Sequence, residues 1–488
     1  MMFRSVAADV LYLQRQRTRP VRKQLKKIVK SRSTKSSVGD IITPDNPLNV
    51  VVAGGGLAGL LTAISLRNAG MKVTVVEKAR SYLPLGGPIQ LAPNGLGTLK
   101  AIDEKLYDEV HKVSRPFWGT ESGLNDGISG EPMFKFDAIT DLPEEFDLPF
   151  AVCIDRSDLQ KILLANLLED AEVQLEMSST FVSYKTLASG QVCVNLEDGR
   201  QLKADLLVGA DGIWSRVRSQ MFKELPGVRN AKMSASFTGF KLYSGLPLLK
   251  TKNFFTTGYC AFLGPDNYFV ICPDKFGFVQ WYAFVKSPPN SENKINCKNF
   301  LQKAFENWCS EVTELIEATN NDEIEQRDVW DRPPSVLKSW ASDNIVLVGD
   351  SCHATMPNIG QGCGIAFEDS YLLVKILKKA KFRTEIPKLL QVFYRKRIVR
   401  TAIIQGLGRL NSEAIKILTP LLPIRSVVDI VLGPILPLIF RIQFAYCYLF
   451  CPEKVAADAS IELAKEMNNR HEKDSEASWC SSKATQQV

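Results

Sequence analysis

Histidine is scarce in this sequence of 488 residues, which contains only His111, His353 and His471. A serine-histidine-acid hydrolase would have to use one of these three, and none lies in a nucleophile-elbow context. The eleven cysteines include no Cys-x-x-Cys pair, and Cys447 and Cys451 have no histidine nearby. We therefore expect neither a hydrolytic triad nor a metal site, and we interpret the cysteines as reduced and mostly buried.

Long uninterrupted apolar runs are also missing. Residues 415–452 are strongly apolar, but prolines and charged residues such as Arg441 divide them into uncharged runs of at most 11 residues. A membrane-spanning helix needs about 20 residues, so we expect none. We expect residues 381–452 to form a helical, apolar region that either covers the core or contacts a lipid surface. From Glu453 to residue 488 the composition turns polar, which predicts a disordered tail.

A dinucleotide-binding fingerprint is present near residue 50. The strand pattern Asn49–Ala53 leads into the glycine turn Gly54–Gly59, then a helix pattern over residues 60–68 and a second strand, Lys72–Val76, which ends at Glu77. This strand, turn, helix and acid order is the context that the fingerprint requires.

The glycines of the turn have distinct roles in such a fingerprint. Gly54 allows the tight turn, Gly56 lets the backbone approach a pyrophosphate, and Gly59 lets the helix pack closely. Glu77 can accept a hydrogen bond from an adenosine ribose hydroxyl and would repel a 2′-phosphate. The segment therefore predicts an adenine dinucleotide.

Two later segments have the same form. Residues 205–208 lead to Gly209–Gly212, and residues 344–348 lead to the glycine loop Gly349–Gly364 and a helix pattern from residue 365 to about 379. Buried parallel strands deliver backbone and carboxylate groups to a cofactor at their C-terminal ends. A nicotinamide dehydrogenase needs only the first fingerprint, whereas FAD must also be held at its ribityl and ring ends. The later segments therefore predict FAD, with the helix N-terminus at the pyrimidine edge of the flavin.

In this order and spacing, the segments resemble the single-component flavoprotein monooxygenases of the aromatic-hydroxylase type. Within that group the chain resembles the zeaxanthin epoxidase family over about residues 50–373. The segments that carry the closer resemblance are Gly87–Gln90, Gly209–Ser215, Gln280–Phe284, Arg327–Pro334 and Gly349–Gly362. Cys352 departs from the family pattern, in which a valine is common at this position.

The resemblance implies a set of flavin contacts and no protein catalytic residue. The expected cofactor-binding residues are Gly54, Gly56, Leu57, Ala58, Gly59, Glu77, Arg156, Asp211, Asp350, Pro357, Gly360 and Gly362. The last three are expected near the flavin ring and Asp350 at a ribityl hydroxyl. Alternatives stay open: Asp350 as a turn cap, Arg156 as an exposed arginine at a helix start, and His353 as a structural residue or a proton carrier.

The resemblance also implies the chemistry. Reduced FAD reacts with dioxygen to give a C4a-hydroperoxide, which delivers an electrophilic oxygen to a ring double bond of a xanthophyll such as zeaxanthin or diatoxanthin. No second dinucleotide fingerprint is present, so the expected electron donor is NAD(P)H at a transient site or a reduced ferredoxin-type carrier. Arg216 and Arg218 are either candidates to contact a phosphate or solvated surface residues.

The expected fold class is α/β, with a Rossmann-like FAD-binding domain, an interleaved antiparallel-sheet substrate domain and a C-terminal helical region. Within a monooxygenase of residues 48–380, the FAD-binding pieces are expected at about 48–100, 155–218 and 344–380, and the substrate sheet at about 101–154 and 233–331. The second sheet segment is rich in Phe, Tyr and Trp, which fill a core or contact a polyene.

The basic charge of the chain is a property of its beginning. Residues 1–40 hold eleven Lys or Arg against two Asp, whereas the whole chain has a net charge of +7. We interpret residues 1–45 as a disordered transit peptide, because the segment is poor in acids and lacks the apolar core of a secretory signal. Such a leader predicts an organelle, and the resemblance to zeaxanthin epoxidases implies a plastid, on the stromal face of the thylakoid or envelope membrane, with a mitochondrion as the alternative. A nucleic-acid partner is not expected, because no aromatic interleaving or binding fold accompanies the basic residues.

The sequence thus predicts an FAD-dependent monooxygenase, peripherally bound to a membrane, that epoxidises a xanthophyll. One alternative keeps the flavin and hydroxylates a small aromatic compound. A less favoured alternative is a flavin-bearing membrane scaffold without turnover.

Overall fold

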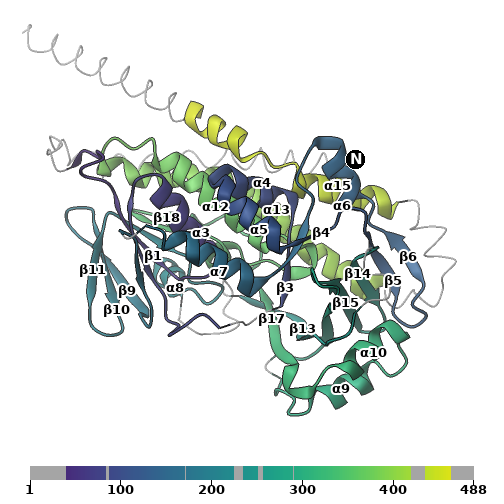
Figure 1. The fold of residues 1–488 in the computed structure, drawn as a ribbon. Helices are drawn as coiled ribbons and strands as arrows, with labels where there is room; N and C mark the ends of the chain where they lie inside the picture. Colours follow the sequence, from purple (N-terminus) through teal and green to yellow (C-terminus); the bar gives the residue numbers. More distant parts are fainter. Residues whose placement is uncertain are drawn as a thin grey trace, which may run out of the picture. The chain divides into compact units, whose positions relative to one another are not determined.

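The structure is a computed structural model that describes residues 40–83, 87–170, 172–224, 235–250, 256–289, 291–418 and 435–462 (Figure 1). The chain divides into two units, Met1–Ile41 and Ile42–Val488. The helices and strands from β1 onward all belong to the second unit. Residues 1–39 of the proposed leader lie outside the described residues.

A six-stranded sheet carries the three predicted strand segments. Its strand order is β18-β19-β12-β1-β2-β8, and every neighbouring pair is parallel except β18 with β19. The strands are β1 (Asn49–Ala53), β2 (Lys72–Val76), β8 (Gln174–Glu176), β12 (Leu206–Gly209), β18 (Ala341–Ser342) and β19 (Ile345–Leu347). Because β1, β12 and β19 run in parallel, the three glycine segments that follow them meet at one edge of the sheet.

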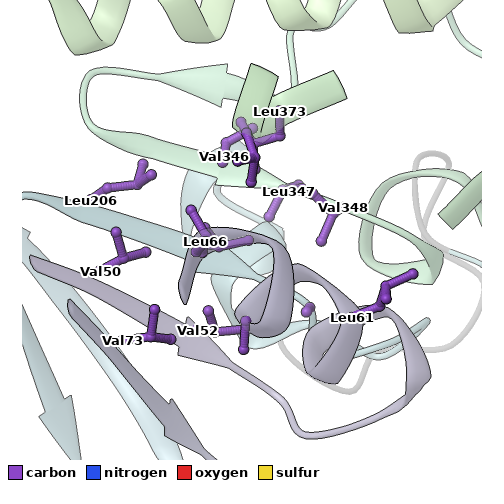
Figure 2. Close-up of a cluster of buried hydrophobic side chains, with 14 of the residues drawn as sticks. Val50, Val52, Leu61, Leu66, Val73, Leu206, Val346, Leu347, Val348 and Leu373 are labelled. Carbon is purple, nitrogen blue, oxygen red and sulfur yellow. The ribbon is translucent and has the colours of Figure 1, made fainter. Parts of the chain in front are cut away.

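The core of this layer lies between the sheet and the helices α3 (Leu57–Asn68) and α12 (Gly362–Leu377). These two helices are joined by a hydrogen bond between the hydroxyls of Thr62 and Ser370, 2.8 Å apart. Figure 2 shows aliphatic side chains of both layers, at most 2% exposed: Val50, Val52, Leu61, Leu66, Val73, Leu206, Val346, Leu347, Val348 and Leu373. Burial of each such side chain stabilises the fold by about 1.5–3 kcal/mol. Because these positions require apolar residues, they form the β-branched and leucine-rich pattern that is recognisable in the sequence.

A seven-stranded sheet forms the second layer system, in the order β17-β13-β16-β15-β14-β5-β6. Its strands are β5 (Glu121–Asp126), β6 (Pro132–Lys135), β13 (Ser236–Gly245), β14 (Thr257–Leu263), β15 (Asn267–Pro273), β16 (Val279–Lys286) and β17 (Glu325–Asp331). The pairing is antiparallel apart from β5 with β14. Helices α9 (Cys297–Ala304) and α10 (Ser310–Ala318) bury Trp281 and Phe305 against this sheet. The expected α/β class with an interleaved, largely antiparallel sheet is confirmed.

Shorter elements link the two sheets. Strands β3 (Pro88–Leu91) and β4 (Arg115–Pro116) pair with β7 (Val152–Asp155), which leads directly into helix α7 (Arg156–Leu167). Helices α4 (Pro93–Ile102) and α5 (Glu104–Val113) follow β3, and α4 lies beside α12. A separate hairpin sheet consists of β9 (Phe181–Thr186), β10 (Val192–Leu196) and β11 (Gln201–Ala204).

The C-terminal region is helical where it is described, as expected. It contains α13 (Ile386–Leu418), which is 33 residues long, and α15 (Leu436–Tyr448), which packs on α6 (Ala138–Phe146). Residues 419–434 of the apolar stretch lie outside the described residues. Among the helices described, none combines the length and the apolar character that a membrane crossing requires.

The prediction of a disordered tail from Glu453 is wrong for its first residues. Residues 452–462 are helical, and Ala459 is fully buried against the core of the first layer. Glu462 forms ion pairs with Arg395 and Lys396 of α13, at 2.8 and 2.9 Å. A polar composition predicted disorder, but one small buried face and two ion pairs are enough to hold this short segment. The remainder of the predicted tail lies outside the described residues.

Candidate functional site

The first glycine turn crosses very close to the end of β12. Gly54 has φ +106°, and a Cβ there would lie 2.4 Å from the carbonyl oxygen of Ala210. A Cβ at Gly59 would lie 1.9 Å from the carbonyl oxygen of Gly54. Both positions therefore require glycine for the turn itself, as the fingerprint predicted.

Gly56 differs from its neighbours because a Cβ there would meet no protein atom within 4 Å. It is the N-cap of α3, and no side chain caps this helix start, where Leu57 and Ala58 form the first turn. The first turn of the helix also contains no acidic residue. Unpaired N–H groups beside open space suit a pyrophosphate, so this helix start fits the proposed cofactor.

Glu77 holds the turn in place with both carboxylate oxygens. Oε2 accepts a hydrogen bond from the backbone N–H of Gly55 at 2.7 Å, and Oε1 accepts one from Ala79 at 2.8 Å. The hydroxyl of Tyr82 is buried beside them and has no hydrogen-bond partner among the described residues. Burial and the negative charge of Glu77 raise the pKa of Tyr82. Glu77 thus has lone pairs left for a ribose hydroxyl, and Tyr82 adds a neutral donor that the sequence alone did not indicate.

Asp211, after β12, caps a helix and still has an unused oxygen. Oδ2 accepts from the backbone N–H groups of Arg216 (2.7 Å) and Val217 (3.2 Å), at the start of α8 (Arg216–Phe222). Oδ1 is buried and has no hydrogen-bond partner in the described part of the chain. Burial raises the pKa of this carboxyl, against the hydrogen bonds that it accepts. The structural role as a cap and the expected contact with a cofactor are therefore compatible.

Asp350 begins α11 (Asp350–His353), directly after β19. Its side chain is exposed to solvent, and yet burial raises the pKa of its carboxyl while His353, Arg156 and Arg332 oppose the rise. Arg156 is the first residue of α7, and its positive charge opposes the rise in pKa of this carboxyl and of the Cys363 thiol. Burial nevertheless raises the pKa of Cys363 to about 12. The structure therefore brings Arg156 and Asp350 close to Cys363 at the start of α12.

The glycine loop before α12 is shaped by the elements opposite it. Residues Pro357–Ile359 form the 3-10 turn η4, in which Pro357 is exposed, and Gly360 follows with φ +60°. A Cβ at Gly360 would lie 2.7 Å from Oε1 of Gln90, so β3 packs against this loop. At Gly362 a Cβ would have only an ordinary contact, at 3.8 Å. No side chain caps the N-terminus of α12, which leaves its first N–H groups available.

The motif segments that carried the family resemblance also meet one another. A Cβ at Gly87 would lie 2.7 Å from the side chain of Gln280, and the hydroxyl of Tyr282 donates a hydrogen bond to the carbonyl oxygen of Pro88. Two segments almost 200 residues apart in the chain therefore form one wall between the two sheets. Similarly, the guanidinium of Arg332 donates to the carbonyl oxygen of Ile213, which joins the Arg327–Pro334 segment to the Asp-Gly segment.

Comparison with known proteins decides the family. The family model described as "FAD binding domain" matches residues 47–402. The chain belongs to the FAD-binding-domain family. The residues described above fit that cofactor: an open helix start at Gly56, an unused buried oxygen on Asp211, and an accessible carboxyl on Asp350 near Arg156.

Among curated proteins, the chain is similar to the chloroplastic zeaxanthin epoxidases of Oryza sativa subsp. japonica and Arabidopsis thaliana. The first is 38% identical over 375 residues, which is 74% of this chain and 55% of that protein. The second is 35% identical over 369 residues, which is 73% of this chain and 53% of that protein. The chain thus spans about half the length of these relatives.

Solved structures show the same fold at lower identity. Klebsiella pneumoniae HpxO, complexed with FAD and uric acid, is 21% identical with a TM-score of 0.69 over 83% of this chain and 98% of that one. A substrate complex of salicylate hydroxylase is 20% identical with a TM-score of 0.67 over 85% of this chain and 98% of that one.

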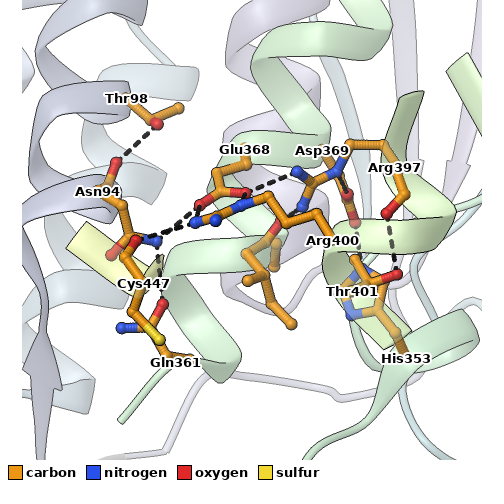
Figure 3. Close-up of polar contacts among 12 residues, drawn as sticks. Asn94, Thr98, His353, Gln361, Glu368, Asp369, Arg397, Arg400, Thr401 and Cys447 are labelled. Atoms are coloured by element: carbon orange, nitrogen blue, oxygen red, sulfur yellow. Dashed lines mark hydrogen bonds and ion pairs between the residues drawn. The ribbon is translucent and has the colours of Figure 1, made fainter. Parts of the chain in front are cut away.

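Behind the predicted flavin edge of this FAD-binding-domain protein lies a buried ionic network that sequence reasoning missed (Figure 3). Arg397 of α13 donates to Glu368 at 2.6 Å and to Asp369 at 2.7 Å, and none of the three side chains is exposed. Arg400 adds two hydrogen bonds to Glu368, each 2.7 Å long, and also donates to the backbone of α15 at Cys447. The network therefore joins α12, α13 and α15.

The same network reaches the loop at the start of α12. The amide of Asn94, on α4, donates to Glu368 at 2.7 Å and to Oε1 of Gln361, the N-cap of α12, at 3.0 Å. Asp369 accepts from the backbone N–H of Gly349 at 2.9 Å. The predicted flavin loop is thus held by Asn94 and Asp369, and the network connects these two residues to Arg397 and Arg400 of the C-terminal region. The adjacent acids Glu368 and Asp369 on α12 were the only signal of this network in the sequence. The arginines that pair with them lie 28 to 32 residues further along the chain.

Cys352, His353 and Asp369 form a buried group whose side-chain ligand atoms all lie within 4.8 Å of one another. Asp369 is already engaged, because Oδ1 accepts from Arg397 and Oδ2 contacts Nε2 of His353 at 2.5 Å. Burial raises the pKa of the Cys352 thiol, which favours the neutral thiol over the thiolate that a metal needs. The cluster contains an ion pair between His353 and Asp369, which is compatible with either of the two roles expected for His353.

Proposed function

We propose that the protein is an FAD-dependent monooxygenase that epoxidises a ring double bond of a xanthophyll of the zeaxanthin or diatoxanthin type. Its strongest support is the joint placement of the three strand-end segments and the wall formed by Gly87–Gln90 and Gln280–Phe284. The relatives named zeaxanthin epoxidase supply the substrate class. Because the chain spans about half of those relatives, substrate, electron donor and location all form part of this proposal.

The chain's own residues would hold FAD at three points. The helix start behind Gly56, Leu57 and Ala58 receives the pyrophosphate, and Glu77 receives the adenosine ribose. Asp211, Asp350 and Arg156 face the middle of the cofactor, and the N-terminus of α12 with Pro357, Gly360 and Gly362 faces the flavin ring, where its partial positive charge stabilises a reduced flavin. When bound and reduced, FAD would supply the two electrons that activate dioxygen, so that one oxygen atom is transferred to the substrate and the other leaves as water.

The sheet side would provide an apolar, neutral surface for the substrate. Burial raises the pKa of Tyr259, Tyr268 and Tyr282, so these phenols stay protonated at neutral pH. Tyr259 and Tyr282 are also partly accessible, so a substrate could contact them. A neutral aromatic wall suits a polyene ring and excludes water from the site of oxygen transfer.

Helix α15 supports access from a membrane. Its outward side carries exposed apolar residues at helical spacing, which we call the α15 face: Ile435, Leu438, Ile439, Ile442, Tyr446 and Leu449. Its inner side packs on α6 through Phe444 and Cys447. Xanthophylls are lipid-soluble, so we propose that the α15 face rests on the lipid surface of a plastid membrane, with the leader as the targeting segment. The donor would be NAD(P)H or a reduced ferredoxin-type carrier.

Hydroxylation of a small aromatic compound is the second candidate, because salicylate hydroxylase has the same fold. The exposed α15 face favours the xanthophyll, since a water-soluble phenol requires no apolar surface of this kind.

A direct assay tests the proposal. The full chain is purified, its flavin spectrum is recorded, and it is incubated with zeaxanthin in lipid vesicles, reductant and dioxygen while carotenoids are followed by chromatography. Appearance of epoxidised carotenoid, absent with a Gly56→Val control, supports the proposal. Donor oxidation stimulated by small phenols without epoxide would favour the hydroxylase, and bound FAD without either activity would favour the scaffold.

A further inference from the structure

A cavity lies behind the Asp-Gly segment, between α8 and the chain that follows β17. Its volume is about 210 Å³, and it is lined by Arg218, Phe222, Arg332, Pro333, Pro334, Ser335, Lys338, Trp340, Cys352 and Gln405. None of these residues belongs to the expected FAD contacts. The cavity has room for a small oxyanion and several water molecules, since each water occupies about 30 Å³ in the liquid.

The lining is positively charged. Arg332 is 4% exposed and Arg218 is 8% exposed, and Lys338 is half-buried. The carboxylate of Glu224 lies 3.5 Å from Nε of Arg218, which is an ion pair without a well-aligned hydrogen bond. Among the charged neighbours that shift the pKa of Arg332, Asp350 has the smallest effect. Three cations thus face the cavity against one paired carboxylate.

Both arginines have donors that no acceptor among the described residues satisfies. Arg332 donates to the carbonyl oxygen of Ile213 through Nη2, but its buried Nε and Nη1 have no hydrogen-bond partner in the described part of the chain. The buried Nε of Arg218 is in the same situation. Burial, and then the like charge of Arg218, lowers the pKa of Arg332 to about 10. Two buried cations without enough acceptors are destabilising unless an anion satisfies them.

The aromatic ring of Phe222 keeps two of the cations in place. The guanidinium of Arg218 lies 4.6 Å from the ring centroid, and Nζ of Lys338 lies 5.1 Å from it. Cation–π contacts of this kind orient a charge without neutralising it. Arg218 and Lys338 therefore remain available to a ligand, in a fixed arrangement beside Arg332.

We propose that this cavity is a binding site for a phosphate-class oxyanion, held by Arg218, Arg332 and Lys338. The oxyanion is either free phosphate or the phosphate group of a nucleotide electron donor. The first source is independent of the proposed function, and the second rests on it. Arg218 was a candidate for a phosphate contact from the sequence, but Arg332 and Lys338 are brought to it only by the fold.

Thermal unfolding of the FAD-loaded full chain tests the site without using enzymatic activity. Sodium phosphate is titrated against sodium chloride at equal ionic strength, and the rise in melting temperature gives an apparent Kd. Lys338→Gln removes a cation from the rim and should weaken phosphate binding about tenfold. Lys294→Gln is the matched control, because Lys294 lies at the same 5.1 Å from the ring of Phe300 in the other layer system. Its phosphate response should equal that of the unmodified chain.

Arg332→Gln and Arg218→Gln should reduce phosphate binding further, and a failure of either to fold leaves the Lys338 comparison intact. The proposal is overturned if phosphate stabilises no better than chloride, or if Lys338→Gln responds as Lys294→Gln does. Competition with NADP⁺ identifies the source. Displacement of phosphate by NADP⁺ in the unmodified chain, and not in Lys338→Gln, assigns the site to a nucleotide phosphate, whereas phosphate binding that NADP⁺ leaves unchanged assigns it to the free ion.

Discussion

The guanidinium of Arg397 lies 2.6 Å from the carboxylate of Glu368, and neither side chain has any exposed surface. Glu368 belongs to the helix whose start faces the predicted flavin ring, and Arg397 belongs to the long helix α13. The same arginine also engages Asp369 at 2.7 Å. This ion pair therefore links the geometry of the candidate cofactor site to the C-terminal helical region, which contributes no residue to the expected set of flavin contacts.

Replacement of Arg397 should be strongly destabilising. Arg397→Met removes the counter-charge that Glu368 and Asp369 share and leaves them only Arg400 and His353, and breaking a buried pair in this way costs about 3–5 kcal/mol. Arg395→Met, two residues earlier on the same helix, removes an ion pair with Glu462 in which both side chains are partly exposed, and it should cost less than about 1 kcal/mol. Urea unfolding followed by circular dichroism measures both. Equal losses for the two variants would show that the network carries no special stability.

The glycine turn separates a binding effect from a folding effect. Gly56 has φ −72° and open space around a Cβ, so Gly56→Val should fold normally but lose FAD, with affinity reduced more than about tenfold. Gly59→Val should fail differently, because its Cβ would collide with the backbone of Gly54 and destabilise the fold by about 3 kcal/mol or more. Flavin absorbance and melting temperature distinguish the two effects. Gly97→Val, where a Cβ also meets nothing, is the control and should keep both properties. Full flavin absorbance in Gly56→Val would refute the assignment.

His353 should make stability depend on pH. Burial alone would lower its pKa, but the carboxylate of Asp369, 2.5 Å from Nε2, holds it well above the usual 6.5. A raised pKa means that the folded state binds the proton more tightly, so the contribution is complete below pH 6.5 and is lost as the pH rises through the folded-state pKa. The melting temperature should therefore fall more steeply from neutral to alkaline pH in the unmodified chain than in His353→Gln. His111→Gln, which changes an exposed histidine, should keep the slope of the unmodified chain. Identical slopes in all three proteins would contradict the prediction.

The elements that could be predicted from the sequence are those whose local residue pattern is compatible with only one type of secondary structure. Asn49–Ala53 and Lys72–Val76 are strands with the predicted bounds, because buried β-branched runs next to glycine turns have few alternatives. Helix α12 starts three residues before the predicted Ile365, at Gly362, since glycine in a helix start is poorly signalled by propensity.

The missed features depend on partners that are distant in the sequence. Arg397 and Asp369 lie 28 residues apart, and no periodicity indicates that they meet in the core. The cavity lined by Arg218 and Arg332 was missed for the same reason, because 114 positions separate these two residues in the chain. The helix at residues 452–462 was missed because Ala459 and Glu462 find their partners on the folded surface and not in their own segment.

The α15 face leads to a prediction about lipid. Ile442 is 62% exposed at its centre, so Ile442→Glu places a charge on the apolar side of the helix without disturbing the contacts with α6. If this face enters a lipid surface, the variant loses burial worth about 1.5–3 kcal/mol and should bind phosphatidylcholine vesicles at least about tenfold more weakly in co-sedimentation. Ile295→Glu is the matched control, because Ile295 is 97% exposed beside α9, and it should bind vesicles as the unmodified chain does. If both variants sediment equally, the exposed apolar residues of α15 serve a contact other than lipid, and the preference for a membrane-borne substrate over a soluble phenol loses the structural feature that supports it.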